Sequence, residues 1–397
     1  MTFFLIIFFY YIIGDSMKKI LLIILLVFVI ISNMSFDLEE DNYEVRCIFI
    51  SYIELSKYIK NYSDLESMNN IDTMINNIKK MKFNTIILQV RSTADSIYNS
   101  KLFPTSMYIS DEEGKYRYDV LDYFIKKAHK NNLKLYAWIN PYRIRVNDNI
   151  LSITEKSPAY KYIGTDVIYV NNGIFFNPSK EVVSDLIVDG VLEVLKYDVD
   201  AVMFDDYFYP SDDIDLYDYE TYVENHNYIS IKDYHLMVVN DMVKRVHDVC
   251  SKKNVKFGIS PDGNIENNYN KNYADVKRWM SDDQYIDFIM PQIYYGFYNS
   301  TRGYVKVIKE WEGLNNKNID LLIALAFYKV GHEDNYAKEG RDEWLNNDNV
   351  IMREIFLSRN LKNYKGFSLF RYDSLFDNKN YTVNTISEIE NMKKIIK

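Results

Sequence analysis

The feature that most constrains this chain is a regular alternation of short apolar segments with longer amphipathic segments from residue 44 onward. The short segments are rich in β-branched and aromatic residues, which is typical of buried strands, whereas the longer ones carry apolar residues at helical spacing. Strands are predicted at 45–52, 85–91, 134–140, 201–205, 256–260, 288–294, 321–327 and 366–371. Helices are predicted at 71–81, 118–131, 180–196, 231–253, 273–282, 303–314, 350–362 and 385–396. Strands that alternate with helices form a parallel sheet, and eight such strands predict a closed (β/α)8 TIM barrel.

The length of the chain agrees with one such barrel. The 397 residues contain 48% hydrophobic residues, enough for a large core, and no low-complexity linker divides them. We therefore predict a single catalytic domain over residues 42–397. The two cysteines, Cys47 and Cys250, fall on a predicted strand and near the end of a predicted helix. Two distant thiols do not indicate a disulfide framework.

The connections between the predicted elements differ in length. Segments that lead into a strand are brief, whereas segments that leave one are long, namely 92–117, 141–179 and 207–230. In a parallel barrel these long loops all lie on the face at the carboxyl ends of the strands. Long loops gathered on one face are usually functional.

Residues 1–36 form a separate segment ahead of the predicted barrel. Apolar runs cover 3–13 and 20–31, and Met17, Lys18 and Lys19 precede the second run. A charged start followed by a short apolar run is typical of a secretory signal. Residues 32–35 lack a clean cleavage site of small residues, so the segment is interpreted as a signal peptide or as an N-terminal membrane anchor. Either reading predicts an exported protein, extracellular or at the cell surface.

Charge and motif content exclude several classes of function. The net charge is −9, with acidic and basic residues interspersed, whereas a nucleic-acid partner requires a basic face. The five histidines are scattered without metal-ligand spacing, and the chain has neither a glycine-rich phosphate loop nor a nucleophile elbow. We therefore predict no metal, no cofactor and no nucleic-acid partner.

Two adjacent carboxylates, Asp205 and Asp206, directly follow residues 201–204, the apolar core of the strand predicted at 201–205. Carboxylates at the carboxyl end of a buried strand are typical of catalytic sites, although paired aspartates also cap helices. Neighbouring strand residues point to opposite faces, so only one of the two enters the barrel. Both alternating sets of the strand are apolar, and parity does not decide which one. We predict both as catalytic together with Glu54, and Glu54 and Asp262 are the next candidate partners of the pair.

Polar side chains follow almost every other predicted strand, and closure of the barrel brings them to one mouth. The predicted substrate-binding residues are Arg91, Asp95, Asn140, Tyr142, Arg143, Tyr207, Asp262, Gln292, Tyr294, Arg371 and Asp373. Carboxylates, amides and aromatic rings are the groups that glycoside hydrolysis requires, since one carboxylic acid protonates the leaving oxygen while another attacks or activates water. The arginines either clamp a carboxylate or N-acyl group of a sugar or form ion pairs with the aspartates. Trp138 and Phe204 are predicted to be core or barrel-lining residues.

Several of these segments together resemble the glycosyl-hydrolase-like 10 family over roughly residues 44–375. The matching runs are 85–91, 136–143, 197–200, 204–210, 258–261, 273–279, 291–294 and 326–331. The resemblance implies a (β/α)8 barrel and an exported or surface-attached bacterial enzyme that acts on glycan. At least one family member is similar to glycosidases that cut peptidoglycan strands stripped of their peptides. Carried over to this chain, the pattern implies roles for Asp205, Asp206, Arg91, Asp95, Asn140, Arg143, Gln292, Tyr294, Arg371 and Asp373.

This chain departs from the family pattern at two places, which bear on the exact substrate. It has Asp262-Gly263-Asn264 where a small residue and an aromatic are expected, and Tyr372 where an acidic residue is common. The sequence thus predicts an exported glycoside hydrolase whose partner is a cell-wall glycan, namely peptide-free peptidoglycan. The alternatives are a non-catalytic carbohydrate-binding or wall-associated barrel, and a glycosidase for another exopolysaccharide.

Overall fold

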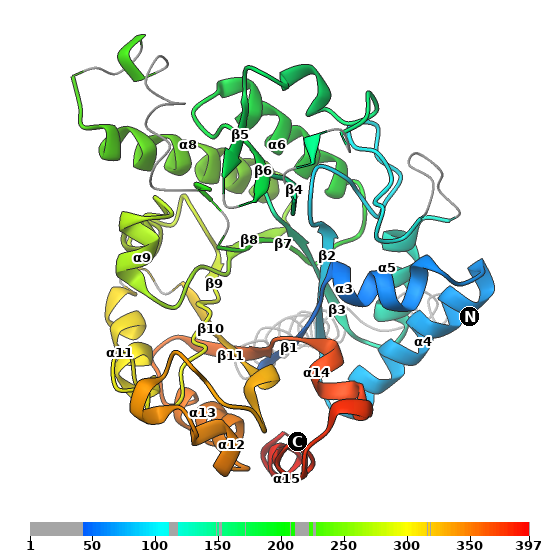
Figure 1. Cartoon of the computed structure of the whole chain (residues 1–397), viewed down its shortest axis with the longest axis vertical. Helices are drawn as coiled ribbons and strands as arrows, with labels where there is room; N and C mark the ends of the chain where they lie inside the picture. The colour runs from blue at the N-terminus through cyan, green and yellow to red at the C-terminus, as the bar shows by residue number, and fades with distance from the viewer. Residues whose placement is uncertain are drawn as a thin grey trace, which may run out of the picture. The chain divides into compact units, whose positions relative to one another are not determined.

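The computed structural model describes most of the chain from Tyr43 to Ile396 (Figure 1). The described residues are 43–110, 118–147, 149–150, 153–170, 172–206, 208–210, 222–224, 228–315, 317 and 319–396. The chain divides after Glu44, and the barrel occupies the unit Val45–Lys397. The predicted signal or anchor at residues 1–36 lies outside the described residues, as does Tyr207.

The core of the fold is a closed, eight-stranded parallel barrel, which confirms the predicted (β/α)8 architecture. Its strands are β1 (Val45–Ile50), β2 (Thr85–Arg91), β3 (Lys134–Ile139), β7 (Ala201–Phe204), β8 (Lys256–Ile259), β9 (Phe288–Ile289), β10 (Asp320–Leu325) and β11 (Tyr364–Leu369). The order around the barrel is β1-β11-β10-β9-β8-β7-β3-β2. The first and last strands close it, with Val45 opposite Gly366. A Cβ atom at Gly366 would lie 1.9 Å from the carbonyl oxygen of Val45, so this seam requires glycine.

Helices surround the barrel at the predicted places. The longer ones are α4 (Asp64–Lys80), α5 (Val120–Lys130), α6 (Glu181–Val194), α8 (Ile231–Ser251), α11 (Tyr304–Leu314), α13 (Val350–Ser358) and α15 (Val383–Ile395). Shorter helices are α3 (Tyr52–Leu55), α9 (Ile265–Asn270), α10 (Val276–Trp279), α12 (Glu343–Asn346) and α14 (Tyr372–Phe376). The helix predicted at 273–282 is wrong in extent and is reduced to α10. Tyr273 has a φ of 50°, which helical residues do not adopt, and the Asp275 side chain caps the helix at its start.

Two apolar layers hold these elements together. A small cluster fills the barrel and includes Ala201, Met203 and Trp138. A larger cluster between the strands and the helices includes Val202 and Phe204. These positions confirm that Trp138 and Phe204 are lining and core residues. They also show which side of β7 faces the interior, which the sequence left open.

The barrel strand β9 is much shorter than the strand predicted at 288–294. The ladder of β9 ends at Ile289, whereas the sequence predicts a strand to residue 294. Pro291 follows directly and has no backbone N–H for a ladder bond. Beyond it only isolated bridges remain, from Gln292 to Asp262 and to Ala324. Gln292 thereby stays attached to the neighbouring strand ends.

The loop predicted at 141–179 contains a small antiparallel sheet that the sequence analysis missed. Its strands are β4 (Arg143–Arg145), β5 (Val167–Val170) and β6 (Gly173–Phe176), in the order β4-β6-β5. The backbone N–H of Ala94 donates to the carbonyl of Ile144, which joins this sheet to the loop after β2. The sheet therefore forms a wall beside the carboxyl-end mouth of the barrel.

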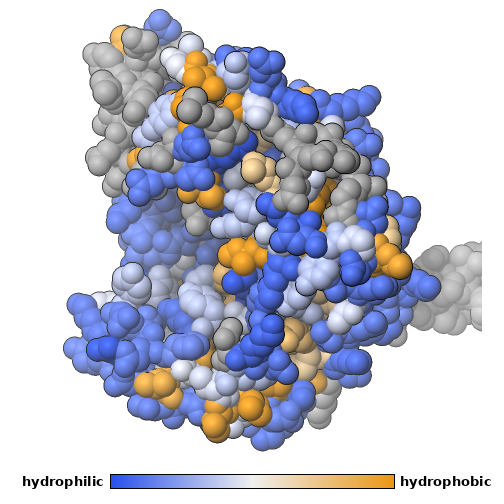
Figure 2. Space-filling model, turned by 45° about the vertical axis from the view of Figure 1, so that its right-hand side comes forward, coloured by the Kyte–Doolittle hydropathy of each residue, from blue (hydrophilic) through white to orange (hydrophobic). Residues whose placement is uncertain are grey.

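The outer surface gives no sign of a membrane-spanning element in the described part of the chain. No helix there combines the length and the apolar character needed to cross a bilayer. The face in Figure 2 is mainly hydrophilic, and its apolar residues lie in small separate groups. Both cysteines are buried free thiols.

Candidate active site

A cavity of about 450 Å³ lies at the carboxyl ends of the barrel strands. It is lined by residues after β1, β7 and β8 together with residues of β4 and β6 of the small sheet. Its charged lining residues are Asp206, Asp262, Arg143 and Arg145. A cavity of this size is in the range of ligand-binding sites.

Asp205 faces the inside of the barrel, in line with Ala201 and Met203, and is only 2% exposed. Its Oδ2 accepts hydrogen bonds from Trp138 Nε1 at 3.0 Å and from Asn140 Nδ2 at 2.5 Å. Asn140 in turn accepts a bond from Gln89 Nε2 at 2.5 Å. Such a network orients side chains and leaves little freedom for a carboxylate to reach a substrate. These bonds favour a positioning role for Asp205, while its predicted catalytic role stays a prediction.

Asp206 lies one residue further along, past the end of β7, and lines the cavity. Burial raises the pKa of its carboxyl to about 6, and the nearby Asp262 charge acts in the same direction. The Gln292 amide, which donates to Asp206 Oδ1 at 3.0 Å, and the Arg143 charge oppose this rise. A carboxyl group with a pKa near 6 is suited to act as a general acid near neutral pH.

Asp262 is the second carboxylate of the cavity. Its Oδ1 accepts a bond from the backbone N–H of Asn264 at 2.8 Å, and its Oδ2 accepts one from Asn267 Nδ2 at 3.2 Å. Hydrogen bonds of this kind hold the carboxyl group in a fixed orientation. The cavity thus combines one carboxyl whose pKa is raised with one carboxylate held by donors, which is the division of roles that glycoside hydrolysis needs.

Gln292 and Asn140 lie at other strand ends and hold the carboxyl groups of Asp206 and Asp205 in place. Gln292 Nε2 also donates to the carbonyl of Ser260 at 3.0 Å, so the amide is held between Asp206 and the end of β8. The sequence analysis missed Gln89, whose Oε1 accepts a bond from the backbone N–H of Tyr52 at 2.9 Å. Gln89 lies two residues after the inward-facing Ile87 on β2, so strand alternation could have predicted that Gln89 also faces the barrel interior.

Arg143 and Tyr294 take different places at the mouth. Arg143 lines the cavity, its Nε donates to the carbonyl of Ser92 at 2.8 Å, and its guanidinium lies 6.0 Å from the ring centre of Tyr52. Tyr294 is absent from the cavity lining. Its ring centre lies 6.0 Å from those of Tyr328 and Phe370, beside the apolar cluster inside the barrel.

Glu54, Arg371 and Asp373 form a separate polar cluster at the ends of β1 and β11. Glu54 has no exposed surface and accepts bonds from Ser51 Oγ at 2.5 Å and from the backbone N–H of Asp373 at 3.2 Å. It also forms an ion pair with Arg371. Asp373 is held by Lys57 at 2.9 Å. Every oxygen of Glu54 is thus engaged, and the geometry favours a positioning role rather than the predicted catalytic one.

Three further predicted residues lie away from the cavity, contrary to the expected convergence. Strand alternation predicts that Arg91, like Gln89, faces the barrel interior. A bulge instead pairs Arg91 with Ile139, which faces the helices. Its guanidinium lies 3.9 Å from the ring centre of Phe103. Tyr142 is fully buried in the outer core. Asp95 is also buried, which raises its pKa above the ordinary range.

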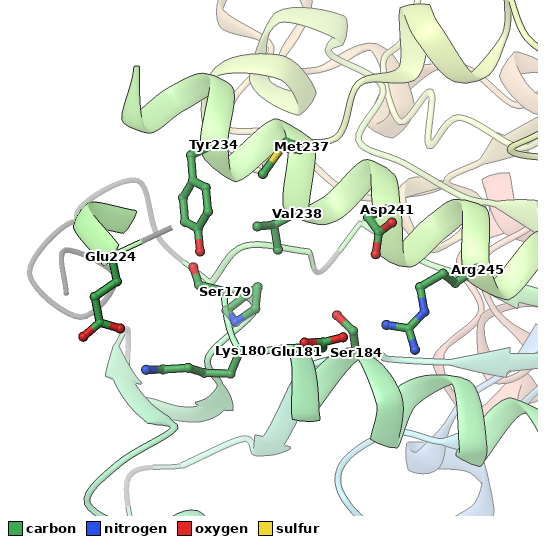
Figure 3. A pocket seen from close by; sticks show the side chains of 11 residues that line it. Ser179, Lys180, Glu181, Ser184, Glu224, Tyr234, Met237, Val238, Asp241 and Arg245 are labelled. Atoms are coloured by element: carbon green, nitrogen blue, oxygen red, sulfur yellow. The ribbon is translucent and has the colours of Figure 1, made fainter. Parts of the chain in front are cut away.

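A second cavity, of about 500 Å³, lies between α6 and α8 (Figure 3). Lys180, Glu181 and Ser184 border it on one side and Asp241 and Arg245 on the other. None of the predicted site residues lines it, and Arg245 is engaged by Asp185. We therefore place the active site at the barrel mouth. Among the described residues, no three His, Cys, Asp or Glu side chains lie close enough together to hold a metal ion.

A closed parallel barrel with two carboxyl groups of contrasting environment in one cavity at its mouth is the architecture of a glycoside hydrolase. Comparison with known proteins supports this class. The sequence profile of the family described as glycosyl hydrolase-like 10 matches residues 44–342, and the chain belongs to this family.

Two curated relatives share this similarity. Glycosyl hydrolase YngK of Bacillus subtilis (strain 168) is 33% identical over 333 residues, which cover 77% of this chain and 63% of YngK. The chain thus spans less than two thirds of that relative. Glycosyl hydrolase DigH of Escherichia coli (strain K12) is 31% identical over 347 residues, which cover 80% of this chain and 77% of DigH.

Solved structures share the fold at low sequence identity. The glycoside hydrolase domain of PgaB (BpsB) from Bordetella bronchiseptica has a TM-score of 0.57 and 12% identity, and covers 89% of this chain and 99% of that domain. The catalytic domain of a β-amylase from Paenibacillus polymyxa has a TM-score of 0.52 and 10% identity, with 90% and 99% covered.

Proposed function

We propose that this protein is exported and hydrolyses glycosidic bonds of a cell-wall glycan, with peptide-free peptidoglycan strands as substrate. The observation that carries the proposal is the cavity at the barrel mouth, where Asp206 has a pKa raised to about 6 beside Asp262. The names of the curated relatives agree with hydrolysis of glycosidic bonds. The apolar runs of residues 1–36 support export.

In the proposed mechanism, protonated Asp206 donates its proton to the glycosidic oxygen as the bond to the anomeric carbon breaks. Asp262 serves the opposite side of the sugar, as the base that activates water or as the nucleophile. Asp205 acts indirectly, because it accepts hydrogen bonds from Trp138 and Asn140 and so fixes both side chains at the end of β3. Gln292 keeps the Asp206 carboxyl oriented toward the cavity.

The test measures release of reducing ends from purified peptide-free glycan strands. Asp206→Asn and Asp262→Asn should each lower kcat/KM by about a hundredfold or more, the range found for acid and base catalysts. Asp283→Asn, an exposed aspartate far along the chain from the site, is the matched control and should keep full activity. The circular dichroism spectra of all four proteins should agree, which shows that each variant is folded.

Three results would contradict the proposal. Activity close to wild type in the Asp206 variant would remove the assigned acid. Tight binding of insoluble wall glycan by the wild-type protein, with no soluble fragments over hours, would favour the non-catalytic binding barrel. Cleavage of another exopolysaccharide in preference to peptidoglycan strands would show that the proposed substrate is wrong.

The proposed export is tested separately. Fusion of residues 1–36 to a reporter that is active only after export should give an active reporter.

A further inference from the structure

A smaller cavity, of about 270 Å³, lies at the carboxyl ends of the strands that close the barrel. Its lining residues follow β1, β10 and β11, which are neighbours in the ring, and include Lys57, Tyr328, Arg371, Asp373 and Asp377. We call it the closing-strand cavity. Among the described residues, none lines both this cavity and the active-site cavity. The sequence predicted substrate binding for Arg371 and Asp373 alone among these five residues.

The charged side chains of the closing-strand cavity are paired with one another. Lys57 Nζ donates to Asp373 Oδ2 at 2.9 Å and to Asp377 Oδ2 at 2.6 Å, and Arg371 forms its ion pair with Glu54. Two cations are thus paired with three carboxylates, so these groups carry no surplus positive charge that would attract an anion. The bond from Lys57 also lowers the pKa of the Asp377 carboxyl, which favours its ionised form.

The two aspartates of this cavity are suited to accept further hydrogen bonds. Their side chains are 15% and 16% exposed, for Asp373 and Asp377 respectively. Each carboxylate oxygen accepts one bond, from Lys57, Tyr58 or the backbone N–H of Lys379, and can accept a second. Hydroxyl groups that donate to a carboxylate form charge-assisted bonds, which are stronger than neutral ones. Because Lys57 already holds both carboxylates, they lose little conformational freedom when a ligand binds.

Tyr328 supplies an aromatic ring to the same cavity and is 41% exposed. Its ring forms T-shaped pairs with Tyr294 at 6.0 Å and with Phe370 at 6.1 Å between ring centres. The next residue, Lys329, donates to the carbonyl of Tyr294 at 2.7 Å and pairs with Asp334 at 2.7 Å. These contacts fix the orientation of the Tyr328 ring while part of it stays exposed. A fixed, exposed aromatic ring can pack against the apolar C–H side of a sugar ring.

One helical segment connects this cavity with the active-site cavity. Tyr52, at the start of α3, lines the active-site cavity. Lys57, in the following helical turn η1 (Ser56–Lys60), lines the closing-strand cavity. Five residues of helix span roughly 8 Å, so the two cavities are neighbours at the mouth of the barrel. A chain of linked sugars bound in the first is therefore within reach of the second.

We infer that the closing-strand cavity is a second sugar-binding site, which holds a sugar unit of the same glycan at a distance from the bond that is cleaved. The inference rests on the proposed function, since it assumes that the active-site cavity holds a glycan. Hydroxyl groups of the sugar donate to Asp373 and Asp377, and its C–H side packs on Tyr328. Because the sugar units are linked covalently, the second site raises the affinity for long strands.

The alternative is that Lys57, Asp373 and Asp377 only tie the closing strands together. Partly exposed ion pairs of this kind contribute little to stability, because solvent screens them. A purely structural role predicts that Asp377→Asn lowers the melting temperature and acts equally on short and long glycans.

The experiment compares the shortest peptide-free glycan oligosaccharide that is cleaved with a strand several times longer. Wild type should show the higher kcat/KM for the longer strand, through a lower KM. Tyr328→Ala and Asp377→Asn should each reduce this ratio of long to short by about threefold to tenfold, through KM and not through kcat. Tyr336→Ala is the matched control, since Tyr336 lies on the same loop, is 90% exposed and does not line the cavity. The control should keep the wild-type ratio.

Glycan binding to the Asp206→Asn variant, measured by titration calorimetry, separates this inference from the proposed function. If Tyr328→Ala in that background weakens binding of the long strand although wild type cleaves no glycan, the second sugar site stands and the catalytic proposal fails. If wild type cleaves both glycans and the ratio is unchanged in Tyr328→Ala and in Asp377→Asn, the sugar site is overturned and the proposed function stands. Inorganic phosphate that binds the full chain, and binds more tightly after Asp377→Asn, would assign an anion site and also overturn the inference.

Discussion

Asp205 and Asp206 are neighbours in the chain, yet the barrel gives them different environments. Asp205 continues the inward-facing set of β7 and is enclosed by Trp138 and Asn140. Asp206 lies beyond the ladder and reaches the cavity. The sequence predicted the pair and its location, because an apolar run ending in two carboxylates is a strong signal. It did not predict their roles, because both faces of β7 are apolar and only ring closure makes one of them the interior.

The activity should decline as the pH rises through about 6. A general acid works in its protonated form, and burial raises the pKa of Asp206 from 3.8 to about 6, so the active form prevails below that pH. The Gln292 amide lowers this pKa by its hydrogen bond to the carboxylate. Gln292→Leu should therefore move the alkaline limb of kcat/KM upward by about one pH unit. A limb that stays in place or moves downward would contradict the assigned acid.

The two aspartates should also differ in their effect on stability. Asp205→Ala leaves the Trp138 N–H and the Asn140 amide buried without their acceptor, which should cost about 1–3 kcal/mol for each group. Asp206→Asn removes a charge that burial makes unfavourable in the folded state and keeps an oxygen for Gln292, so the free energy of unfolding at pH 7 should be unchanged or higher. Urea denaturation at pH 7 compares the two. Equal losses in both variants would be inconsistent with a positioning role for Asp205.

At the scale of single elements, one bulge in β2 changes which residues reach the mouth. Strand alternation places Arg91 inward after Ile87 and Gln89, but the register shift opposite β3 turns it toward α6. A one-residue shift reverses the side on which every later side chain lies, and the sequence of β2 carries no glycine or proline to signal it. The small sheet of β4, β5 and β6 escaped prediction for a related reason, since strands of three or four residues are too short for a periodic pattern.

Gly190 of α6 should be essential for the packing of Arg91 against this helix. A Cβ atom there would lie 2.1 Å from Arg91 Nη1 and 2.9 Å from Phe103 Cε2. Gly190→Ala should therefore destabilise the protein by about 1–3 kcal/mol, although alanine is the better helix former. The matched control is Gly313→Ala in α11, where no atom lies within 4 Å of the added carbon. The control should be neutral or up to about 1 kcal/mol stabilising. Equal melting temperatures for both variants would contradict the packing of Arg91 on α6.

For the whole molecule, the alternation of strands and helices sufficed to predict the closed barrel, because each element carries its own periodic signal. The predicted convergence of side chains from the strand ends is found only in part. Asp206, Asp262 and Arg143 meet in one cavity, whereas Glu54, Arg371 and Asp373 join a cluster at the closing strands. Which strand ends share a cavity depends on loop packing around the full ring, and such long-range contacts leave no trace in local sequence patterns.

The last helix of the chain, α15, packs on α13 through buried carboxyl groups. Glu388 of α15 has no exposed surface, and its Oε1 accepts a bond from the backbone N–H of Met352 at 2.9 Å. Glu354 of α13 is equally buried, and within the described part of the chain neither of its carboxylate oxygens has a hydrogen-bond partner. Burial raises the pKa of Glu388 to about 7 and that of Glu354 well above its ordinary value.

These two groups should make the folded barrel less stable as the pH rises. A carboxyl group whose pKa is higher in the folded than in the unfolded state holds its proton longer in the folded state. Its stabilising contribution is complete below the unfolded value of about 4.5 and is lost as the pH rises through the folded value of about 7 for Glu388. The free energy of unfolding should therefore fall between pH 5 and pH 8, by up to about 1.4 kcal/mol per pH unit for each group.

Glu388→Gln and Glu354→Gln should each flatten this dependence, because an amide keeps the polar shape without titrating. Their stability relative to wild type should be greatest at pH 8 and smallest at pH 5. Glu390→Gln, on the exposed side of the same helix, is the matched control and should follow the wild-type curve. Urea denaturation at pH 5, 6, 7 and 8 measures all four proteins. If the Glu388 variant loses as much stability toward pH 8 as wild type, the Glu388 carboxyl group between α13 and α15 does not cause the pH dependence of the free energy of unfolding.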